Sequence, residues 1–181
     1  MAATLLSAGQ SDAYNRKPTF EGPDQLAAAI KEKTVPELKT KKTTASVQTF
    51  LKKAAKGDRY EACQFLLATF EKATKDKAAM WGSAIVGVGA ETMTYANGDQ
   101  LDWPIGGFSP RAQNIVIYGM KASPRHAALM KKIGKAKMGG GCTYIKSLDG
   151  VDQNVLAELI TTAMQAKLQR YPSRAKARKK A

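Results

Sequence analysis

The residues best suited to chemistry lie in the segment MGGGCTYIK, residues 138–146, where three glycines precede one of only two cysteines. A cysteine thiolate can act as a nucleophile, and successive glycine N–H groups can bind an anion. Lys135 and Lys137 add positive charge before the glycines, and Arg111 offers a two-pronged guanidinium for the same anion. The segment therefore has three interpretations: a nucleophile site, an anion site, or a turn of the chain.

The turn is the interpretation that these residues favour, because glycine most often serves to supply a positive φ. A Walker-type phosphate loop needs its glycines between a strand and a helix, and here they precede a strand-like segment. Catalysis by Cys142 requires a neighbour that lowers its pKa, and His126, the sole histidine, is expected on a surface helix. We therefore expect a non-enzymatic protein, in which the turn and strand can also line a ligand site. The residues of that turn and strand are Gly139, Gly140, Gly141, Cys142 and Tyr144.

The best local pair of carboxylates is formed by Asp99 and Asp102, beside the turn signal Asn97-Gly98. Iron and other hard metal ions are bound by clustered oxygen ligands, so this pair is the candidate metal site. The alternative is that two exposed carboxylates beside a turn only solubilise the hairpin. Zinc is not expected, because His126 has no cluster of cysteine or histidine around it.

Aromatic residues flank the segment GGFSPR, residues 106–111. Trp103, Phe108 and Ser109 either line a cleft for a flat or apolar ligand or close the core between sheet and helices. Trp81, by contrast, is expected in the core.

The net charge of +14 is unevenly distributed along the chain. Residues 83–163 carry eight basic and six acidic side chains, whereas residues 164–181 carry seven basic and no acidic ones. A basic segment of this kind binds nucleic acid without sequence preference through the phosphates, and the alternative is a solubilising terminus. Its basic residues are Lys167, Arg170, Arg174, Lys176, Arg178, Lys179 and Lys180.

The elements that must position these residues follow from the hydrophobic periodicity. Apolar residues at three- and four-residue spacing predict a helix after Ser46, a longer one through Cys63, and a last one capped by Asp152. A short helix opens at Ser123-Pro124, and PIGGFSPRAQ, residues 104–113, is expected to be a loop. Strands are predicted at SAIVGVGA, TMTYA, DQLDW, NIVIYGM and CTYIK. Their close succession favours an α+β fold, in which an antiparallel meander of about five strands packs against helices in the order ααββββαβα.

Length and composition fit one folded domain with appended ends. Residues 1–43 are expected to be a flexible extension, residues 44–168 the folded domain, and residues 169–181 a basic disordered tail. Two distant cysteines do not form a disulfide scaffold, no apolar run reaches the roughly 20 residues that span a bilayer, and no secretory signal is recognisable. These features predict a cytoplasmic protein that does not enter a membrane.

Several motifs occur in a fixed order between residues 44 and 165: Met-Trp-Gly at 80–82, an Ile-Val-Gly strand, Gly-Phe-Ser-Pro-Arg at 107–111, and the glycine turn into Cys142. Together they resemble the bacterial YdhG-like domain of unknown function. The sequence departs from the family pattern at Val88, Ala112, Ala136 and Thr143, where the family favours phenylalanine, lysine, histidine and leucine.

Most members of this family are uncharacterised, and one branch is described as a frataxin-like iron chaperone. Iron is therefore the cargo that the resemblance implies. The residues themselves leave two other partners open, a small anionic ligand at the glycine turn and, through the basic ends, nucleic acid or the ribosome.

Overall fold

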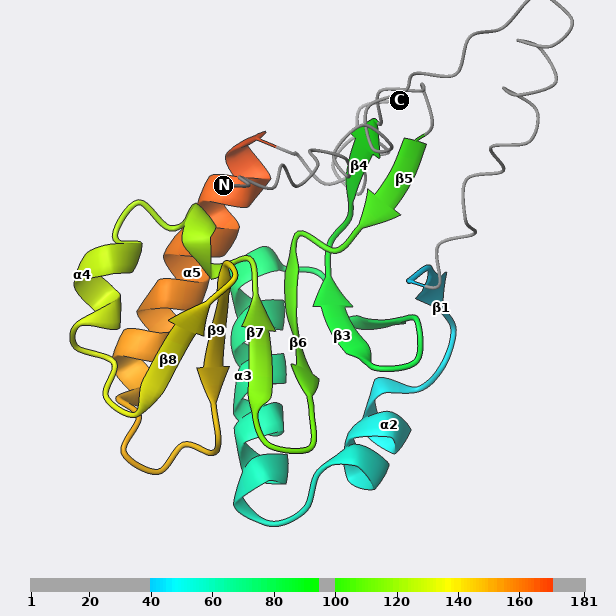
Figure 1. Ribbon diagram of the computed structural model, residues 1–181. Helices are drawn as coiled ribbons and strands as arrows, with labels where there is room; N and C mark the ends of the chain where they lie inside the picture. Colours follow the sequence, from blue (N-terminus) through cyan, green and yellow to red (C-terminus); the bar gives the residue numbers. More distant parts are fainter. Residues whose placement is uncertain (1–39, 95–99, 171–181) are drawn as a thin grey trace, which may run out of the picture. The chain divides into compact units, whose positions relative to one another are not determined.

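The computed structural model describes residues 40–94 and 100–170, which form an α+β fold (Figure 1). Helices α3 (Asp58–Thr74) and α5 (Gln153–Arg170) lie together on one face of a seven-stranded sheet, whose neighbouring strands are all antiparallel. The strands lie in the order β1 (Lys42–Thr43), β2 (Ala79–Trp81), β3 (Ile85–Val88), β6 (Gly106–Pro110), β7 (Ile115–Tyr118), β9 (Cys142–Ile145) and β8 (Ala136–Gly139).

A separate two-stranded sheet, β4 (Glu91–Thr94) and β5 (Gln100–Trp103), is inserted between β3 and β6. The predicted hairpin is confirmed, because Thr92 pairs with Asp102 in an antiparallel register. Its predicted turn, Asn97-Gly98, lies outside the described residues. The smaller helices are α2 (Val47–Ala54), the 3-10 helix η1 (Met120–Ala122) and α4 (His126–Met130).

The expectation that residues 104–113 form a loop is wrong, because β6 occupies Gly106–Pro110 at the centre of the sheet. Because positions 106 and 107 are glycines, the segment lacks the alternation of apolar and polar side chains by which a strand is recognised in a sequence. The glycines are needed there because other groups come close to the backbone. A Cβ on Gly106 would lie 2.4 Å from Met164 Cε, and one on Gly107 would lie 2.2 Å from the Val86 carbonyl oxygen.

The sheet also has more strands than the five that the sequence predicts, because very short strands do not show a recognisable periodic pattern of apolar residues. β8 precedes the glycine turn, and β1 pairs with β2 so that Lys42 lies opposite Trp81. The sheet therefore begins within the segment predicted to be a flexible extension, while residues 1–39 of that segment lie outside the described part of the chain.

Two helices begin where the sequence predicts them, at polar side chains that accept hydrogen bonds from free backbone N–H groups. Ser46 Oγ accepts a bond from the Thr49 N–H at 3.2 Å, which caps α2. Asp152 Oδ1 accepts bonds from the N–H groups of Asn154 at 2.9 Å and Val155 at 3.1 Å, at the start of α5. Asp152 is therefore used as a helix cap.

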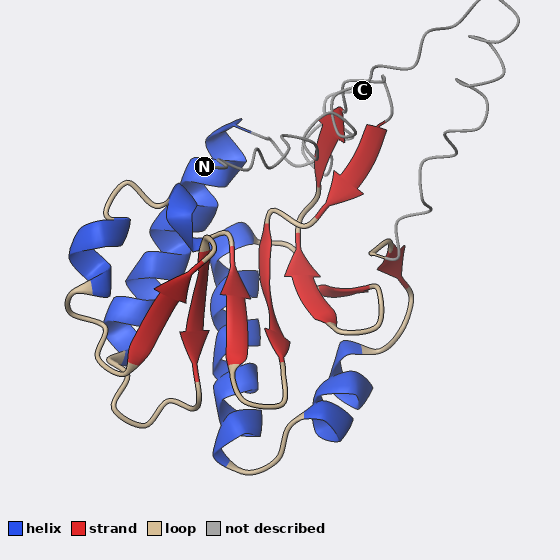
Figure 2. Cartoon of the chain, viewed as in Figure 1, coloured by secondary structure: helices blue, strands red, loops and turns tan. Residues whose placement is uncertain are grey.

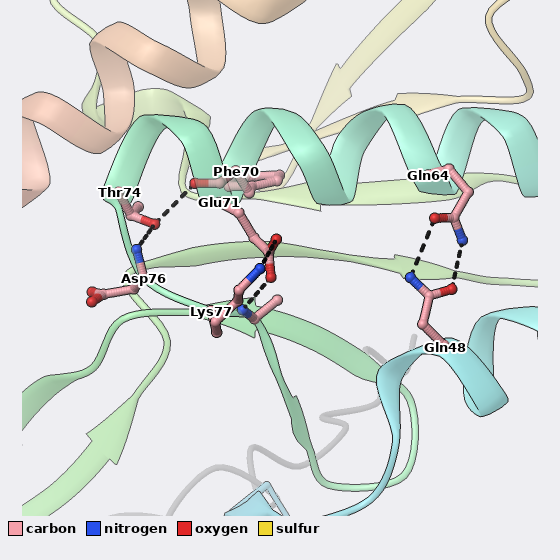
Figure 3. Close-up of polar contacts among 8 residues, drawn as sticks. Gln48, Gln64, Phe70, Glu71, Thr74, Asp76 and Lys77 are labelled. Carbon is pink, nitrogen blue, oxygen red and sulfur yellow. Dashed lines mark hydrogen bonds and ion pairs between the residues drawn. The ribbon is translucent and has the colours of Figure 1, made fainter.

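Side-chain hydrogen bonds join α3 to α2 and close its C-terminal end (Figure 3). Gln48 on α2 and Gln64 on α3 exchange amide hydrogen bonds at 3.3 and 3.0 Å. At the C-terminal end, Thr74 Oγ1 donates to the Phe70 carbonyl of the same helix at 2.9 Å, and the Glu71 carboxylate accepts from the Ala78 N–H at 3.0 Å. These bonds direct the chain from α3 into β2.

The core lies between the sheet and the helix pair formed by α3 and α5. Phe108 on β6 and Phe70 on α3 stack with their ring centroids 6.3 Å apart, and Cys63 is fully buried nearby in the same cluster. Phe108 and Ser109 are both at most 1% exposed, so of the two alternatives burial is favoured over a ligand cleft. Ser109 Oγ instead donates a hydrogen bond to the Ala84 carbonyl at 2.6 Å. Trp81 is buried as predicted, but it packs over Gly87 on the opposite face of the sheet and is not part of this core cluster.

Candidate anion-binding site

The face of the sheet opposite α3 and α5 carries side chains from alternate positions of β7 and β9. Ile115, Ile117 and Ile145 are buried toward the helices. Because successive side chains of a strand point to opposite faces, Val116 and Tyr118 on β7 and Cys142 and Tyr144 on β9 point the other way. These four are half-buried, and no described helix covers this side of the sheet (Figure 2).

Tyr144 lies at the centre of this face. It pairs with Val116 on one side and with Lys137 of the edge strand β8 on the other. Tyr118, two positions beyond Val116, is its diagonal neighbour on β7. Lys146 lies two positions beyond Tyr144 along the chain and is exposed. We call Tyr118, Tyr144, Lys137 and Lys146 the tyrosine–lysine face.

A groove of about 840 Å³ runs along β8 and β9 at this face. Among the described residues, its charged lining consists of three lysines, Lys135, Lys137 and Lys146, and one acid, Asp149. Lys135 Nζ binds Asp149 Oδ2 at 2.7 Å, so the single acid is already neutralised. Lys137 and Lys146 have no acidic partner in the described part of the chain, which leaves the groove with a net positive charge.

Two titratable groups of the groove have shifted pKa values. The hydrogen bond and charge of Lys135 hold the pKa of Asp149 below its ordinary value. Desolvation, followed by the neighbouring Cys142 and Tyr118, raises the pKa of Tyr144. At neutral pH Asp149 is therefore ionised and paired, while the Tyr144 phenol is neutral.

The glycine segment forms the turn that joins β8 to β9, as the sequence favours. Gly139 pairs with Cys142, so Gly140 and Gly141 are the two central residues of the hairpin turn. Both have positive φ, 55° and 87°, as a type I′ hairpin turn requires. Gly139 itself belongs to β8. The turn therefore connects two strands, whereas the sequence predicts a strand only after the glycines.

Cys142 and His126 are not brought together. Thr143 Oγ1 lies 3.9 Å from Met130 Sδ, so α4 lies on the side of the sheet to which Thr143 points. Cys142 points to the opposite face. His126, the first residue of α4, is therefore separated from Cys142 by the sheet.

Arg111 lies far from the glycine turn. It is in the connection between β6 and β7, which is at the opposite end of the strands from the connection between β8 and β9 (Figure 1). The Arg59 guanidinium donates to the carbonyls of Arg111 and Ala112 and fixes this connection. Arg111 therefore does not join the anion site that the sequence suggests.

The predicted metal pair is described only in part. Asp102 accepts a hydrogen bond from Thr92 Oγ1 at 2.7 Å across the hairpin, and Asp99 lies outside the described residues. Across residues 40–94 and 100–170, no three histidine, cysteine, aspartate or glutamate residues form a group that could hold a metal. Trp103, also on this hairpin, pairs with Glu91, and its indole Nε1 is buried without a hydrogen-bond partner among the described residues.

The predicted nucleic-acid residues fall mostly outside the described chain. Arg170 is the exposed last residue of α5, and residues 171–181 are not described. Lys167 is not on an open surface, because its Nζ binds the Glu91 carboxylate at 2.8 Å.

Two residues of the tyrosine–lysine face, Tyr118 and Lys146, are absent from the sequence-based set of candidates. The signal that could have found them is alternation. In NIVIYGM and CTYIK, the period of two along a strand places the isoleucines on one face and Val116, Tyr118, Cys142 and Tyr144 on the other, although Val116 and Thr143 interrupt the alternation of apolar and polar residues.

No family model, no curated protein and no solved structure matches this chain. None of the described helices has the length and apolar character needed to cross a membrane. The inference of function therefore rests on the fold and the groove.

Proposed function

We propose that this protein is a non-enzymatic binding module that binds an anionic ligand in the groove along β8 and β9. The observation that carries this proposal is the pairing of Lys137 with Tyr144 in a groove whose single acid, Asp149, is already bound by Lys135. Lys137 and Lys146 are thus exposed cations with no acidic partner among the described residues. An anion in the groove would complete their pairing with charge-assisted hydrogen bonds.

A binding role is supported over catalysis by the separation of the reactive side chains. Nucleophilic catalysis needs a base within hydrogen-bond reach of the nucleophile. Cys142 and His126 are on opposite sides of the sheet. The two free cysteines also support the cytoplasmic location that belongs to this proposal.

Kinship with the YdhG-like domain remains a proposal carried by the order of motifs at residues 80–82, 107–111 and 139–142. The iron cargo that it implies has less support than an anion, because Asp102 already accepts a hydrogen bond from Thr92. Binding of nucleic acid through the basic residues after Arg170 is a second candidate, supported by the charge of that segment alone.

Titration calorimetry with tripolyphosphate tests the anion site. The double variant Lys137→Gln, Lys146→Gln should bind about tenfold more weakly, since each lysine contributes a charge-assisted contact. The matched control is Lys52→Gln, Lys53→Gln, which removes the same charge from exposed positions on α2 and should retain affinity within about twofold.

Two results would contradict the proposal. The first is that the unaltered protein does not bind tripolyphosphate. The second is that both double variants lose affinity equally, which would mean that general positive charge, and not the groove, attracts the anion.

A further inference from the structure

We infer that the anionic ligand is a single-stranded nucleic acid, whose bases stack on Tyr118 and Tyr144 while its phosphates contact Lys137 and Lys146. This inference rests on the proposed anion-binding function and adds the class of ligand. It uses a surface of the folded domain, which is distinct from the basic segment after Arg170.

The first step is the arrangement of the two tyrosines. Tyr118 and Tyr144 lie on β7 and β9, which are neighbours inside the sheet and not at its edge. Val116 pairs with Tyr144, so the two tyrosines are diagonal neighbours about 7–8 Å apart. This separation suits neighbouring bases of an extended single strand. In the described chain the only stacked ring pair is Phe70 with Phe108, so neither tyrosine ring is stacked on another ring.

The second step is the boundary of the accessible face. On the β2–β3 side, a Cβ on Gly87 would lie 2.7 Å from Trp81 Cδ1 and 2.6 Å from Pro104 Cβ. Trp81 and Pro104 therefore cover that part of the sheet. The part formed by β7, β9 and β8 keeps half-buried tyrosines and an exposed lysine, so a ligand can reach it.

The third step is the position of the charges around the rings. Lys137 flanks Tyr144 on the β8 side, and Lys146 lies beyond it at one end of β9. Lys121 lies at the other end, where its Cδ would be 3.8 Å from a Cβ on Gly141. Exposed cations therefore surround two aromatic rings. Aromatic rings and flanking cations are the combination by which proteins bind single strands without sequence preference.

Single strands are favoured over duplexes because the tyrosines contribute only when bases are unpaired and free to stack. A duplex offers the lysines its phosphates and gives the rings no exposed base face. Tyr144 is also neutral at physiological pH, as a phenol with an ordinary pKa of about 10 is, and desolvation and its neighbours raise that pKa further, so the phenol does not repel phosphate.

Fluorescence anisotropy of the full chain with labelled oligothymidylate of about 12 nucleotides tests this inference. Tyr118→Val and Tyr144→Val keep the strand propensity and remove the ring. Each should weaken oligonucleotide binding by roughly 5- to 150-fold. Tripolyphosphate affinity should stay within about twofold in Tyr118→Val, because Tyr118 does not line the groove. Tyr144→Phe keeps the ring and should retain affinity, and the duplex of the same length should bind more weakly than the single strand. Thermal unfolding of each variant confirms that it is folded.

The outcomes separate this inference from the function on which it rests. If the lysine variants lose tripolyphosphate but the valine variants bind oligonucleotide as before, stacking is overturned and anion binding stands. If tripolyphosphate does not bind at all, the proposed function has failed. Equal affinity for the duplex would overturn the inference. Another contrary result would be that the unaltered protein is a dimer that does not bind the oligonucleotide, and that sedimentation finds the valine variants to be monomers. A second copy of the chain would then cover this face.

Discussion

Lys167 on α5 donates hydrogen bonds to both carboxylate oxygens of Glu91, the first residue of β4, at 2.8 and 3.0 Å. The lysine side chain is 23% exposed and the glutamate 11%, so the pair is largely sheltered from water. The contact joins the last helix to the base of the inserted hairpin. Lys167 therefore has a structural partner, although its sequence neighbourhood suggests a contact with nucleic acid.

Lys167→Met should lower the free energy of unfolding by about 1–3 kcal/mol, because it leaves a sheltered carboxylate without its cation. Urea denaturation measures the change. Lys135→Met is the matched control, since the Lys135–Asp149 pair is 71% and 77% exposed and should contribute less than about 1 kcal/mol. Equal losses in the two variants would contradict the structural role of the Lys167–Glu91 pair. The double variant Lys167→Met, Glu91→Gln should recover part of the loss.

Gly87→Ala should destabilise the fold by about 1–3 kcal/mol, because its Cβ would meet both Trp81 and Pro104 at less than 3 Å. Gly139→Ala is the control. Its Cβ would have only Tyr144 Cε2 nearby, at 3.6 Å, so its effect should stay within about 0.5 kcal/mol. Thermal or urea unfolding compares the two. A neutral Gly87→Ala would show that Trp81 does not pack against this strand.

Cys63 should resist thiol reagents in the folded protein, whereas Cys142 should react. Cys63 is fully buried, and burial raises the pKa of its thiol to about 11 despite the opposing charge of Arg59. Cys142 is half-buried on the open face of the sheet. Labelling with a chromogenic disulfide should therefore modify one thiol before unfolding and none in Cys142→Ala. Two rapid equivalents in the folded protein would contradict the burial of Cys63.

Cys63 should also make stability fall at alkaline pH. Its pKa is 9.0 in an exposed setting and about 11 in the fold, so between these values the unfolded thiol ionises first. Ionisation of the unfolded state alone favours unfolding, and the free energy of unfolding should decrease as the pH rises through that window. Urea denaturation across the window should show a smaller decrease in Cys63→Ala, Cys142→Ala than in Cys142→Ala alone. Identical pH profiles would be the contrary result.

Asp149 should titrate below the ordinary aspartate range, because Lys135 donates a hydrogen bond to it and adds a favourable charge. Carboxyl resonances followed by NMR during an acid titration measure this pKa directly. Lys135→Gln should raise it toward the ordinary value. Lys53→Gln on α2 should leave it unchanged. If Lys135→Gln leaves the pKa of Asp149 unchanged, the ion pair that lines the groove is contradicted.

The sequence by itself was sufficient for the fold class, the main helices and their caps. Ser46 and Asp152 mark helix starts through local hydrogen bonds, and the apolar spacing around Cys63 and Leu156 marks the buried helix faces. The glycine turn could also be predicted from the sequence, because positive φ at Gly140 and Gly141 is a local backbone requirement. Such features depend on neighbours a few residues away, and the order of residues specifies them.

Only the tertiary structure decided which residues share a surface. The sequence does not indicate β6, because its glycines at 106 and 107 are required by close contacts with Met164 and Val86, which are distant in sequence. The sequence suggests that Lys167 contacts a ligand, whereas in the fold it binds Glu91, which is 76 residues away. The tyrosine–lysine face arises in the same way, because Tyr118, Lys137 and Tyr144 become neighbours only through the pairing of β7, β9 and β8. Strand register is set by packing across the whole core, so local spacing cannot specify which side chains gather on the opposite face.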